Sequence, residues 1–86
     1  MGKLVVIYSL NYCGYCKKLK KLLEKESITY IDKDIDDKIH EREYELMKKR
    51  TNNELIPLIR IGSKLLVADK DFDKIDEALA KIKELI

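Results

Sequence analysis

The sequence predicts an α/β protein in three layers, with a four-stranded mixed sheet and the element order β-α-β-α-β-β-α. Three observations lead to this fold class. Residues 4–8 are apolar throughout and β-branched in the middle, which is typical of a central strand buried on both faces. Gly62-Ser63 separates two short apolar runs, as in a hairpin. Residues 72–86 carry apolar side chains at helical spacings of three and four.

The first half of the chain predicts two strands that alternate with two helices. The expected strands cover residues 4–8 and 28–34, and the expected helices cover residues 14–26 and about 37–50. Cys16 lies three residues before Leu19, so it shares the core-facing side of the first helix. Asp36 or Asp37 can cap the second helix, whose apolar stripe is weak. A strand, a helix and a further strand in this order indicate parallel strands with a right-handed crossover.

The second half predicts a hairpin followed by a helix. The third strand is expected over residues 55–61, with Pro57 near its start, and the fourth over residues 65–67. Residues 69–71 then open the final helix. The strongest helical pattern in the chain follows, carried by Phe72, Ile75, Leu79, Ile82 and Ile86.

Length and composition limit the classes of protein to which the chain can belong. With 86 residues, it is expected to form one domain over residues 1–86. Hydrophobic residues make up 45% and charged residues 40%, which is typical of a soluble globular protein. The net charge of +2 gives no general attraction to nucleic acid, and no apolar stretch reaches the ~20 residues that cross a membrane. The N-terminus lacks the apolar region of a signal peptide, so a cytoplasmic location is expected.

The segment Cys13-Gly14-Tyr15-Cys16 holds the only two cysteines, at the predicted junction between the first strand and the first helix. The unpaired N–H groups of a helix's first turn stabilise a thiolate over a thiol, and the thiolate is the nucleophile in disulfide exchange. We therefore expect Cys13 to attack a disulfide and Cys16 to resolve the resulting mixed disulfide. In a reducing compartment, such a pair indicates a redox or metal site rather than a structural disulfide.

Four lysines follow the cysteines in the predicted first helix: Lys17, Lys18, Lys20 and Lys21. Their positive potential favours a thiolate at the helix start. A solvated helix face is the alternative interpretation, and the two interpretations can hold together.

Two other uses of the cysteines stay open. A structural zinc site needs four ligands, whereas the chain offers two Cys and one His, His40, which lies in a charged stretch and is expected to face solvent. No metal site within one chain is therefore expected. An iron–sulfur cluster or metal that the same thiols bind in a dimer remains an alternative. A third hypothesis is an interaction module in which both cysteines are incidental.

The order of the elements, with Cys-x-x-Cys at the first strand-to-helix junction, resembles the thioredoxin fold. Within that fold the chain resembles the glutaredoxin family. The residues that carry the resemblance are Tyr8-Ser9, Cys13-Gly14-Tyr15-Cys16, Ile56-Pro57 and Asp71. The resemblance implies a thiol–disulfide oxidoreductase that reduces protein disulfides or glutathione mixed disulfides through a Cys13/Cys16 dithiol–disulfide cycle.

The resemblance also implies what the protein works with. The cysteine pair is itself the redox carrier, so no cofactor is expected, and glutathione is a candidate co-substrate. Electrons would come from glutathione, from a thioredoxin-reductase-type flavoenzyme or from another small thiol. The protein is expected to act as a monomer.

Further site residues follow from the same resemblance. In the thioredoxin fold the proline that matches Pro57 is cis and faces the cysteine pair, which leaves the backbone of the preceding residue, here Ile56, free to pair with an extended substrate. Tyr12 and Tyr15 flank the thiols and are candidates for the apolar rim of the groove. Lys70 and Asp71 are candidates for contacts to a bound peptide or tripeptide.

The chain departs from the usual glutaredoxin pattern near the site. Gly14 stands where proline is usual, which adds backbone freedom between the cysteines. Val67-Ala68 stands where the family typically carries Gly-Gly, ahead of the residues that hold the glutamyl end of glutathione. A valine side chain there is expected to obstruct close backbone approach. The loop Leu10-Asn11-Tyr12 also lacks a lysine that is frequent in the family, so the use of glutathione stays open at this point.

Overall fold

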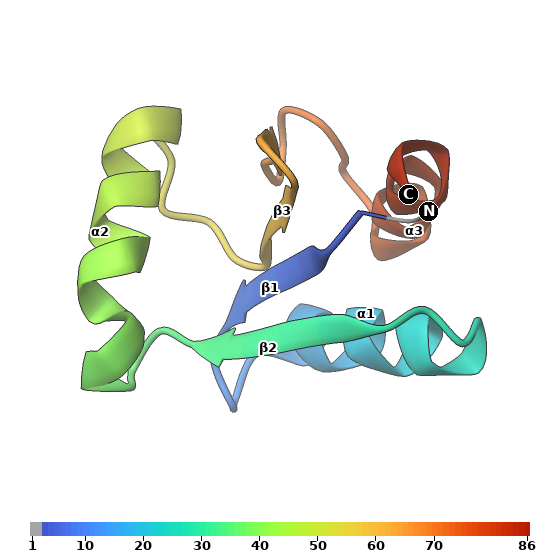
Figure 1. Cartoon of the computed structure of the whole chain (residues 1–86), viewed down its shortest axis with the longest axis horizontal. Helices are drawn as coiled ribbons and strands as arrows, with labels where there is room; N and C mark the ends of the chain where they lie inside the picture. Colours follow the sequence, from blue (N-terminus) through green and yellow to red (C-terminus); the bar gives the residue numbers. More distant parts are fainter. Residues whose placement is uncertain (1–2) are drawn as a thin grey trace.

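Residues 3–86 are described by a computed structural model, in which four strands form one sheet in the order β2-β1-β3-β4 (Figure 1). The elements are β1 (Val5–Ser9), α1 (Gly14–Lys25), β2 (Tyr30–Asp34), α2 (Lys38–Thr51), β3 (Leu58–Ile61), β4 (Lys64–Leu66) and α3 (Ile75–Leu85). The predicted fold class and element order are confirmed. Within residues 3–86, no helix is both long enough and apolar enough to span a membrane.

The strand β1 lies inside the sheet, as its apolar sequence predicts. It pairs parallel with β2 and antiparallel with β3, and β3 pairs antiparallel with β4. All five residues of β1 are buried, as expected of a strand that is covered by helices on both faces. The carboxyl end of this buried strand, at Ser9, leads into the loop before the cysteines.

Helices cover both faces of the sheet: α2 lies on one face, and α1 and α3 lie on the other (Figure 1). Side chains of β1 alternate between these faces. Ile7 packs with Leu19 of α1 and Ile82 of α3, whereas Tyr8 packs with Tyr44 of α2. The three predicted layers are therefore confirmed, and the start of α1 is held against a packed core.

The third strand differs from the prediction at its start. It begins at Leu58, not at residue 55. Pro57 therefore precedes the strand, where its missing N–H leaves no gap in the hydrogen-bond ladder. In the hairpin, Ile61 pairs with Lys64, so Gly62-Ser63 forms the predicted two-residue loop.

The final helix starts at Ile75, not at residues 69–71 as predicted. Asp69 adopts a left-handed conformation with φ of 68°. The Asp71 carboxylate accepts a hydrogen bond from the N–H of Val67 at 2.7 Å. Such bonds between a side chain and nearby backbone favour a turn over a helix. The segment that was expected to open the helix is instead a loop.

Acidic side chains cap the N-terminal ends of α2 and α3. Asp37, one of the two expected caps of α2, accepts the N–H of Ile39 at 3.1 Å. Glu77 accepts the N–H of Lys74 at 2.9 Å at the start of α3. In both helices a carboxylate satisfies a backbone donor that has no partner inside the helix.

The end of α1 explains why the second strand starts later than predicted. Ser27 is left-handed with φ of 58°, and its N–H donates to the Glu24 carbonyl at 3.1 Å. The N–H of Ile28 donates to the Leu23 carbonyl at 2.9 Å, which completes a Schellman motif. Ile28 thus belongs to the helix end, and β2 starts at Tyr30.

Candidate active site

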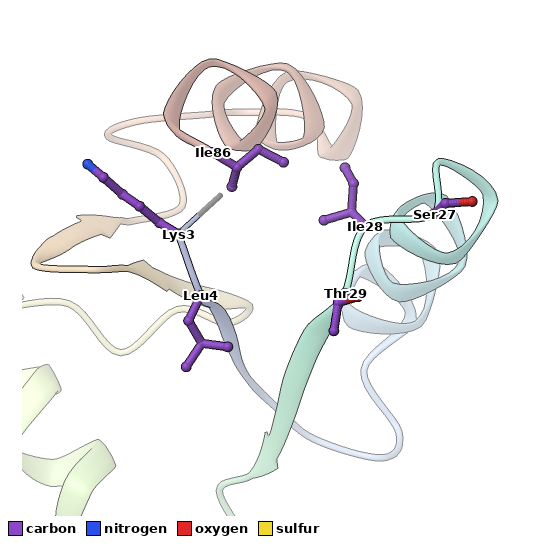
Figure 2. A pocket seen from close by; sticks show the side chains of 6 residues that line it. All are labelled: Lys3, Leu4, Ser27, Ile28, Thr29 and Ile86. Atoms are coloured by element: carbon purple, nitrogen blue, oxygen red, sulfur yellow. The ribbon is translucent and has the colours of Figure 1, made fainter. Parts of the chain in front are cut away.

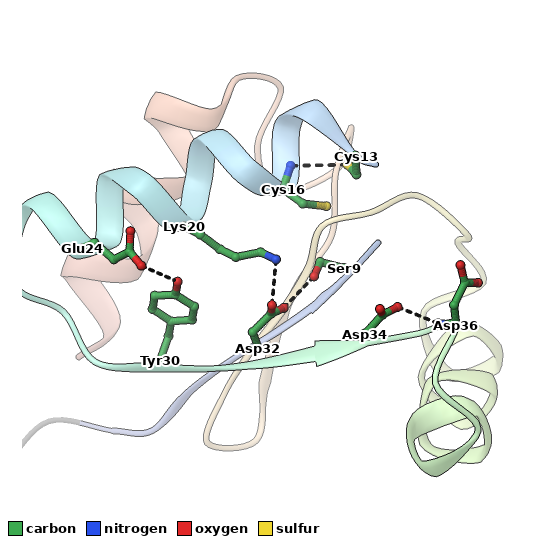
Figure 3. A network of polar contacts seen from close by, with 9 residues as sticks. All are labelled: Ser9, Cys13, Cys16, Lys20, Glu24, Tyr30, Asp32, Asp34 and Asp36. Atoms are coloured by element: carbon green, nitrogen blue, oxygen red, sulfur yellow. Dashed lines mark hydrogen bonds and ion pairs between the residues drawn. The ribbon is translucent and has the colours of Figure 1, made fainter. Parts of the chain in front are cut away.

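Cys13 lies between β1 and α1 and is the N-cap residue of α1. Its Sγ accepts a hydrogen bond from the N–H of Cys16 at 3.3 Å (Figure 3). A turn in front of it is closed by a 3.1 Å hydrogen bond from the Cys13 N–H to the Leu10 carbonyl. A thiolate at Cys13 would face the positive end of the helix and a backbone donor, and both favour a negative charge on sulfur.

The two thiols differ in their exposure. Both are free; Cys13 is half-buried, whereas Cys16 is 0% exposed. Burial, and then the hydrogen bond with Cys13, raises the pKa of the Cys16 thiol above its ordinary value. Cys16 is therefore a neutral thiol at neutral pH, and Cys13 is the thiol that an incoming disulfide can reach.

A hollow of about 230 Å³ lies beside Tyr15, the residue that precedes Cys16. Three segments that are far apart in the sequence form it: the first turn of α1, the residues before β3, and the loop between β4 and α3. It is lined by Tyr15, Leu55, Ile56, Pro57, Ala68, Asp69, Phe72, Asp73 and Ile75. Three of the predicted site residues, Tyr15, Ile56 and Pro57, therefore lie around one hollow.

The Ile56-Pro57 peptide bond is cis, as the resemblance implies. Pro57 is buried, and Ile56 is half-buried against the core on the α2 side of the sheet. Neither backbone group of Ile56 has a hydrogen-bond partner among residues 3–86. Because unpaired backbone groups seek partners, an extended chain that enters the hollow can pair with Ile56.

Tyr12, Lys70 and Asp71, also predicted as site residues, do not line this hollow. Tyr12 is 75% exposed, and Lys70 is exposed as well. Asp71 turns into its own loop and borders a different hollow, together with Lys81. These three residues therefore lie outside the hollow that Pro57 lines.

Asp69 and Asp73 line the hollow instead, and the sequence interpretation missed both. The reason is the helix that was predicted to begin in this segment. Residues 69–71 form a turn, in which the Asp71 N–H donates to the Val67 carbonyl at 2.8 Å, and this turn leaves Asp69 and Asp73 beside the hollow while Asp71 borders a different one. Three Asp residues within five positions were the signal, because Asp side chains that bond to nearby backbone favour turns.

Val67 and Ala68 have different positions relative to the hollow. Val67 is 4% exposed and packs against Tyr8 and Tyr44 on the α2 side of the sheet. The expectation that its side chain obstructs the groove is therefore wrong. Ala68 lines the hollow, so its methyl group occupies space there that a glycine would leave open.

A larger hollow, of about 430 Å³, lies at the opposite end of β1 (Figure 2). It is lined by Lys3, Leu4, Ser27, Ile28, Thr29 and Ile86. This lining contains no thiol and no acidic or histidine side chain. Because Leu4 precedes β1 and the cysteines follow it, the length of a strand separates this hollow from the thiols. We therefore assign the candidate active site to the smaller hollow.

Metal ligands do not cluster at the cysteines. Among residues 3–86, no group of three or more His, Cys, Asp or Glu side chains is arranged to hold a metal ion. His40 lies in the first turn of α2 and does not join the cysteines in such a group. A metal or cluster bound by Cys13 and Cys16 would need further ligands from a second molecule.

Comparison with known proteins gives matches over most of the chain. The family model described as Glutaredoxin matches residues 5–66, which include both cysteines and Pro57. An uncharacterised glutaredoxin-like 8.6 kDa protein in the rubredoxin operon of Clostridium pasteurianum is 30% identical over 76 residues, or 86% of this chain and 99% of that protein. Glutaredoxin 1 of Rickettsia prowazekii is 32% identical over 59 residues, or 69% of this chain and 62% of that protein. The crystal structure of the holo form of glutaredoxin C1 from Populus tremula x tremuloides has a TM-score of 0.68 and 25% identity, covering 93% of this chain and 74% of that one.

Proposed function

The chain belongs to the glutaredoxin family and is a thiol–disulfide oxidoreductase, and we propose that Cys13 and Cys16 carry this activity in a dithiol–disulfide cycle. One observation carries the proposal: the reachable thiol receives a helix N–H, and the buried thiol lies one turn behind it. An attacking thiol needs access and a stabilised thiolate, whereas a resolving thiol needs only to reach the first sulfur. The geometry therefore supports Cys13 as the nucleophile and Cys16 as the resolving residue.

The proposed cycle has two exchange steps. First, the Cys13 thiolate attacks one sulfur of the substrate disulfide, so that a Cys13–substrate bond forms and the other half of the substrate leaves as a thiolate. Then Cys16 loses its proton and attacks the Cys13 sulfur. A Cys13–Cys16 disulfide forms, and the remaining substrate leaves reduced. The electron pair that reduces the substrate comes from the cysteine pair.

We infer that the hollow beside Tyr15 holds the substrate chain. The unpaired backbone of Ile56 offers hydrogen bonds to an extended peptide, and Tyr15 offers an apolar surface. Asp69 and Asp73 favour a substrate that carries an ammonium group there. Protein disulfides with a basic flank and glutathione mixed disulfides both meet this description.

The cycle needs an electron donor that returns the disulfide to the dithiol. The donors we propose are glutathione or a thioredoxin-reductase-type flavoenzyme. The cycle needs no resident cofactor, because the cysteine pair is itself the electron carrier. Glutathione would approach Cys13 along the hollow that Ala68 lines. The rate at which the protein reacts with glutathione therefore distinguishes the two donors.

The test uses the Cys16→Ser variant, in which a mixed disulfide on Cys13 is trapped. This variant and Cys13→Ser are mixed near neutral pH with oxidised glutathione or a small reference disulfide, and adducts are followed by mass spectrometry. We expect rapid adduct formation in Cys16→Ser and slow formation in Cys13→Ser. Equal rates in the two variants would contradict the proposed roles. A fast reaction of Cys16→Ser with the reference disulfide alone would keep the roles and favour a donor other than glutathione.

A second candidate function is a carrier of an iron–sulfur cluster or metal that the same thiols bind in a dimer. Two observations favour it: the poplar relative was solved in a holo form, and Cys13 is accessible at the surface. Visible absorbance that a chelator removes, from a protein purified as a dimer, would support this function. A colourless monomer that reduces a protein disulfide would exclude it.

A further inference from the structure

A polar network lies between α1 and the sheet, close behind the cysteines. The Ser9 hydroxyl donates to Asp32 Oδ1 at 2.6 Å, and the Lys20 ammonium donates to Asp32 Oδ2 at 2.8 Å (Figure 3). Asp32 pairs with Ile7 across β1 and β2, so its side chain and that of Ser9 face the α1 side of the sheet. Both carboxylate oxygens are thereby used, and the Lys20 ammonium is paired with one of them.

Lys20 differs from the other lysines that follow the cysteines. Its side chain is 17% exposed, whereas Lys18 and Lys21 are exposed on the outer face of the helix. A lysine normally keeps its ammonium in water, and an ammonium that is withdrawn from water needs a partner. Asp32 supplies that partner. The network therefore holds a positive charge on the side of α1 that faces the sheet.

This charge lies near the buried thiol. Lys20 follows Cys16 by four residues, so the two share one face of α1. Figure 3 shows the Cys16 thiol and the Lys20 ammonium directed toward the same side of the helix, above Asp32. Burial is the main cause of the raised pKa of Cys16, whereas a backbone hydrogen bond at Leu10 and the charge of Lys20 both lower that pKa. The other titratable groups near Cys16 are Cys13 on the same helix, the Tyr44 phenol of α2 and the Asp32 carboxylate of β2, which pairs with the Lys20 ammonium. Lys20 is the cation among them.

We propose that Lys20, held by Asp32 and Ser9, is a positioning residue for resolution: its ammonium stabilises the thiolate with which Cys16 attacks Cys13. The inference rests on the dithiol cycle proposed above. In this step Cys16 gives its proton to water, its thiolate attacks the Cys13 sulfur, and the Cys13–Cys16 bond replaces the bond to the substrate, which leaves as a thiolate. Burial opposes a thiolate at Cys16, and a cation paired on the same helix face counteracts part of that effect.

Single-turnover reaction with dithiobisnitrobenzoate separates the two steps. The first coloured thionitrobenzoate is released when Cys13 attacks, and the second when Cys16 resolves. We expect Lys20→Met to slow the first release no more than Lys21→Met does, and to slow the second roughly threefold to tenfold, because the smaller thiolate fraction is partly offset by a more nucleophilic sulfur. The pH profile of the second release should move to higher pH by about one unit. Lys20→Arg, which keeps the charge, should restore the wild-type rate.

Lys21→Met is the matched control, because it removes the same charge from the exposed face of the same helix. An unchanged second release in Lys20→Met, or equal slowing in Lys21→Met, would overturn the inference. Slowing of both releases in Lys20→Met that Lys20→Arg does not restore would also overturn it, since that result reports a damaged structure. A wild-type protein that releases only the first equivalent would instead contradict the dithiol cycle.

Discussion

The backbone N–H of Cys16 donates to the Sγ of Cys13 at 3.3 Å, so a hydrogen bond joins the two cysteines before any disulfide forms. The donor belongs to the backbone, and rotation of the Cys16 side chain therefore does not disturb it. The same turn of α1 places one sulfur at the helix start and buries the other. The attacking and resolving roles thus follow from the position of each cysteine in a single helical turn.

Substitution of Ala68, whose methyl group lines the hollow beside Pro57, tests whether that hollow holds substrate. In a Cys16→Ser background, Ala68→Leu should slow adduct formation with oxidised glutathione by roughly tenfold, because the larger side chain fills the hollow. A small reference disulfide should react within about twofold of its original rate. Ala68→Gly is the matched opposite change and should accelerate the reaction with oxidised glutathione. Equal slowing of both disulfides in Ala68→Leu would show that substrates do not use the hollow.

Tyr44 connects α2 to the segment that precedes the cis proline. Its hydroxyl donates to the Glu54 carbonyl at 3.0 Å, and its ring is buried. Tyr44→Phe should lower the free energy of unfolding by about 1 kcal/mol, because the carbonyl loses its partner. Tyr30→Phe is the control, since the Tyr30 hydroxyl bonds to Glu24 at the surface, and it should change stability by less than about 0.5 kcal/mol. Urea denaturation measures both, and equal losses would refute the structural role of Tyr44.

The left-handed serine at the end of α1 predicts a stabilising substitution. Ser27 has φ of 58°, a conformation that glycine adopts without the steric cost of a Cβ atom. Ser27→Gly should raise the free energy of unfolding by about 0.5–1 kcal/mol. Ser63→Gly makes the same chemical change at a residue without a positive φ and should not stabilise the protein. A melting temperature that falls in Ser27→Gly would contradict the helix end described here.

Stability should fall at alkaline pH. Burial raises the pKa of Cys16 and also that of Tyr8, whose hydroxyl has no hydrogen-bond partner among residues 3–86. Both groups are acids that stay neutral to higher pH in the folded protein than in the unfolded chain. Above the ordinary thiol pKa of about 8.5 the unfolded chain therefore binds fewer protons, and stability is lost as the pH rises.

This stability prediction can be checked by urea denaturation between about pH 7 and pH 10, below and above the ordinary thiol pKa. The midpoint should be constant at the lower end and fall at the upper end. Cys16→Ala removes the thiol contribution and should make the fall shallower. A wild-type midpoint that stays level or rises above about pH 8.5 would contradict the buried, neutral state of Cys16.

The sheet and the cysteine junction could be predicted because local patterns determine them. The apolar run of residues 4–8 requires burial on both faces, and Cys13 follows that strand at the start of the first predicted helix. The buried position of Cys16 followed from its spacing to Leu19. In each case, the residues of a single strand or helix are enough for the prediction.

The lining of the hollow could not be predicted in the same way. Asp69 and Asp73 meet Pro57 only through the folding of two distant segments onto each other. The conformation of their loop depends on one left-handed residue and on one hydrogen bond between a side chain and the backbone. These two features outweigh the helical spacing of the apolar residues that follow. The side of the sheet on which Val67 packs likewise depends on the register between strands.

Competitive alkylation of the reduced wild-type protein tests whether Cys13 is the reactive thiol and Cys16 the protected one. The protein is treated near neutral pH with a small amount of iodoacetamide, and the label is assigned by fragmentation of the tryptic peptide that contains both cysteines. We expect Cys13 to be labelled at least about tenfold faster, and Cys16 to react only after denaturation or at alkaline pH. Equal labelling of the two cysteines, or faster labelling of Cys16, would contradict this expectation.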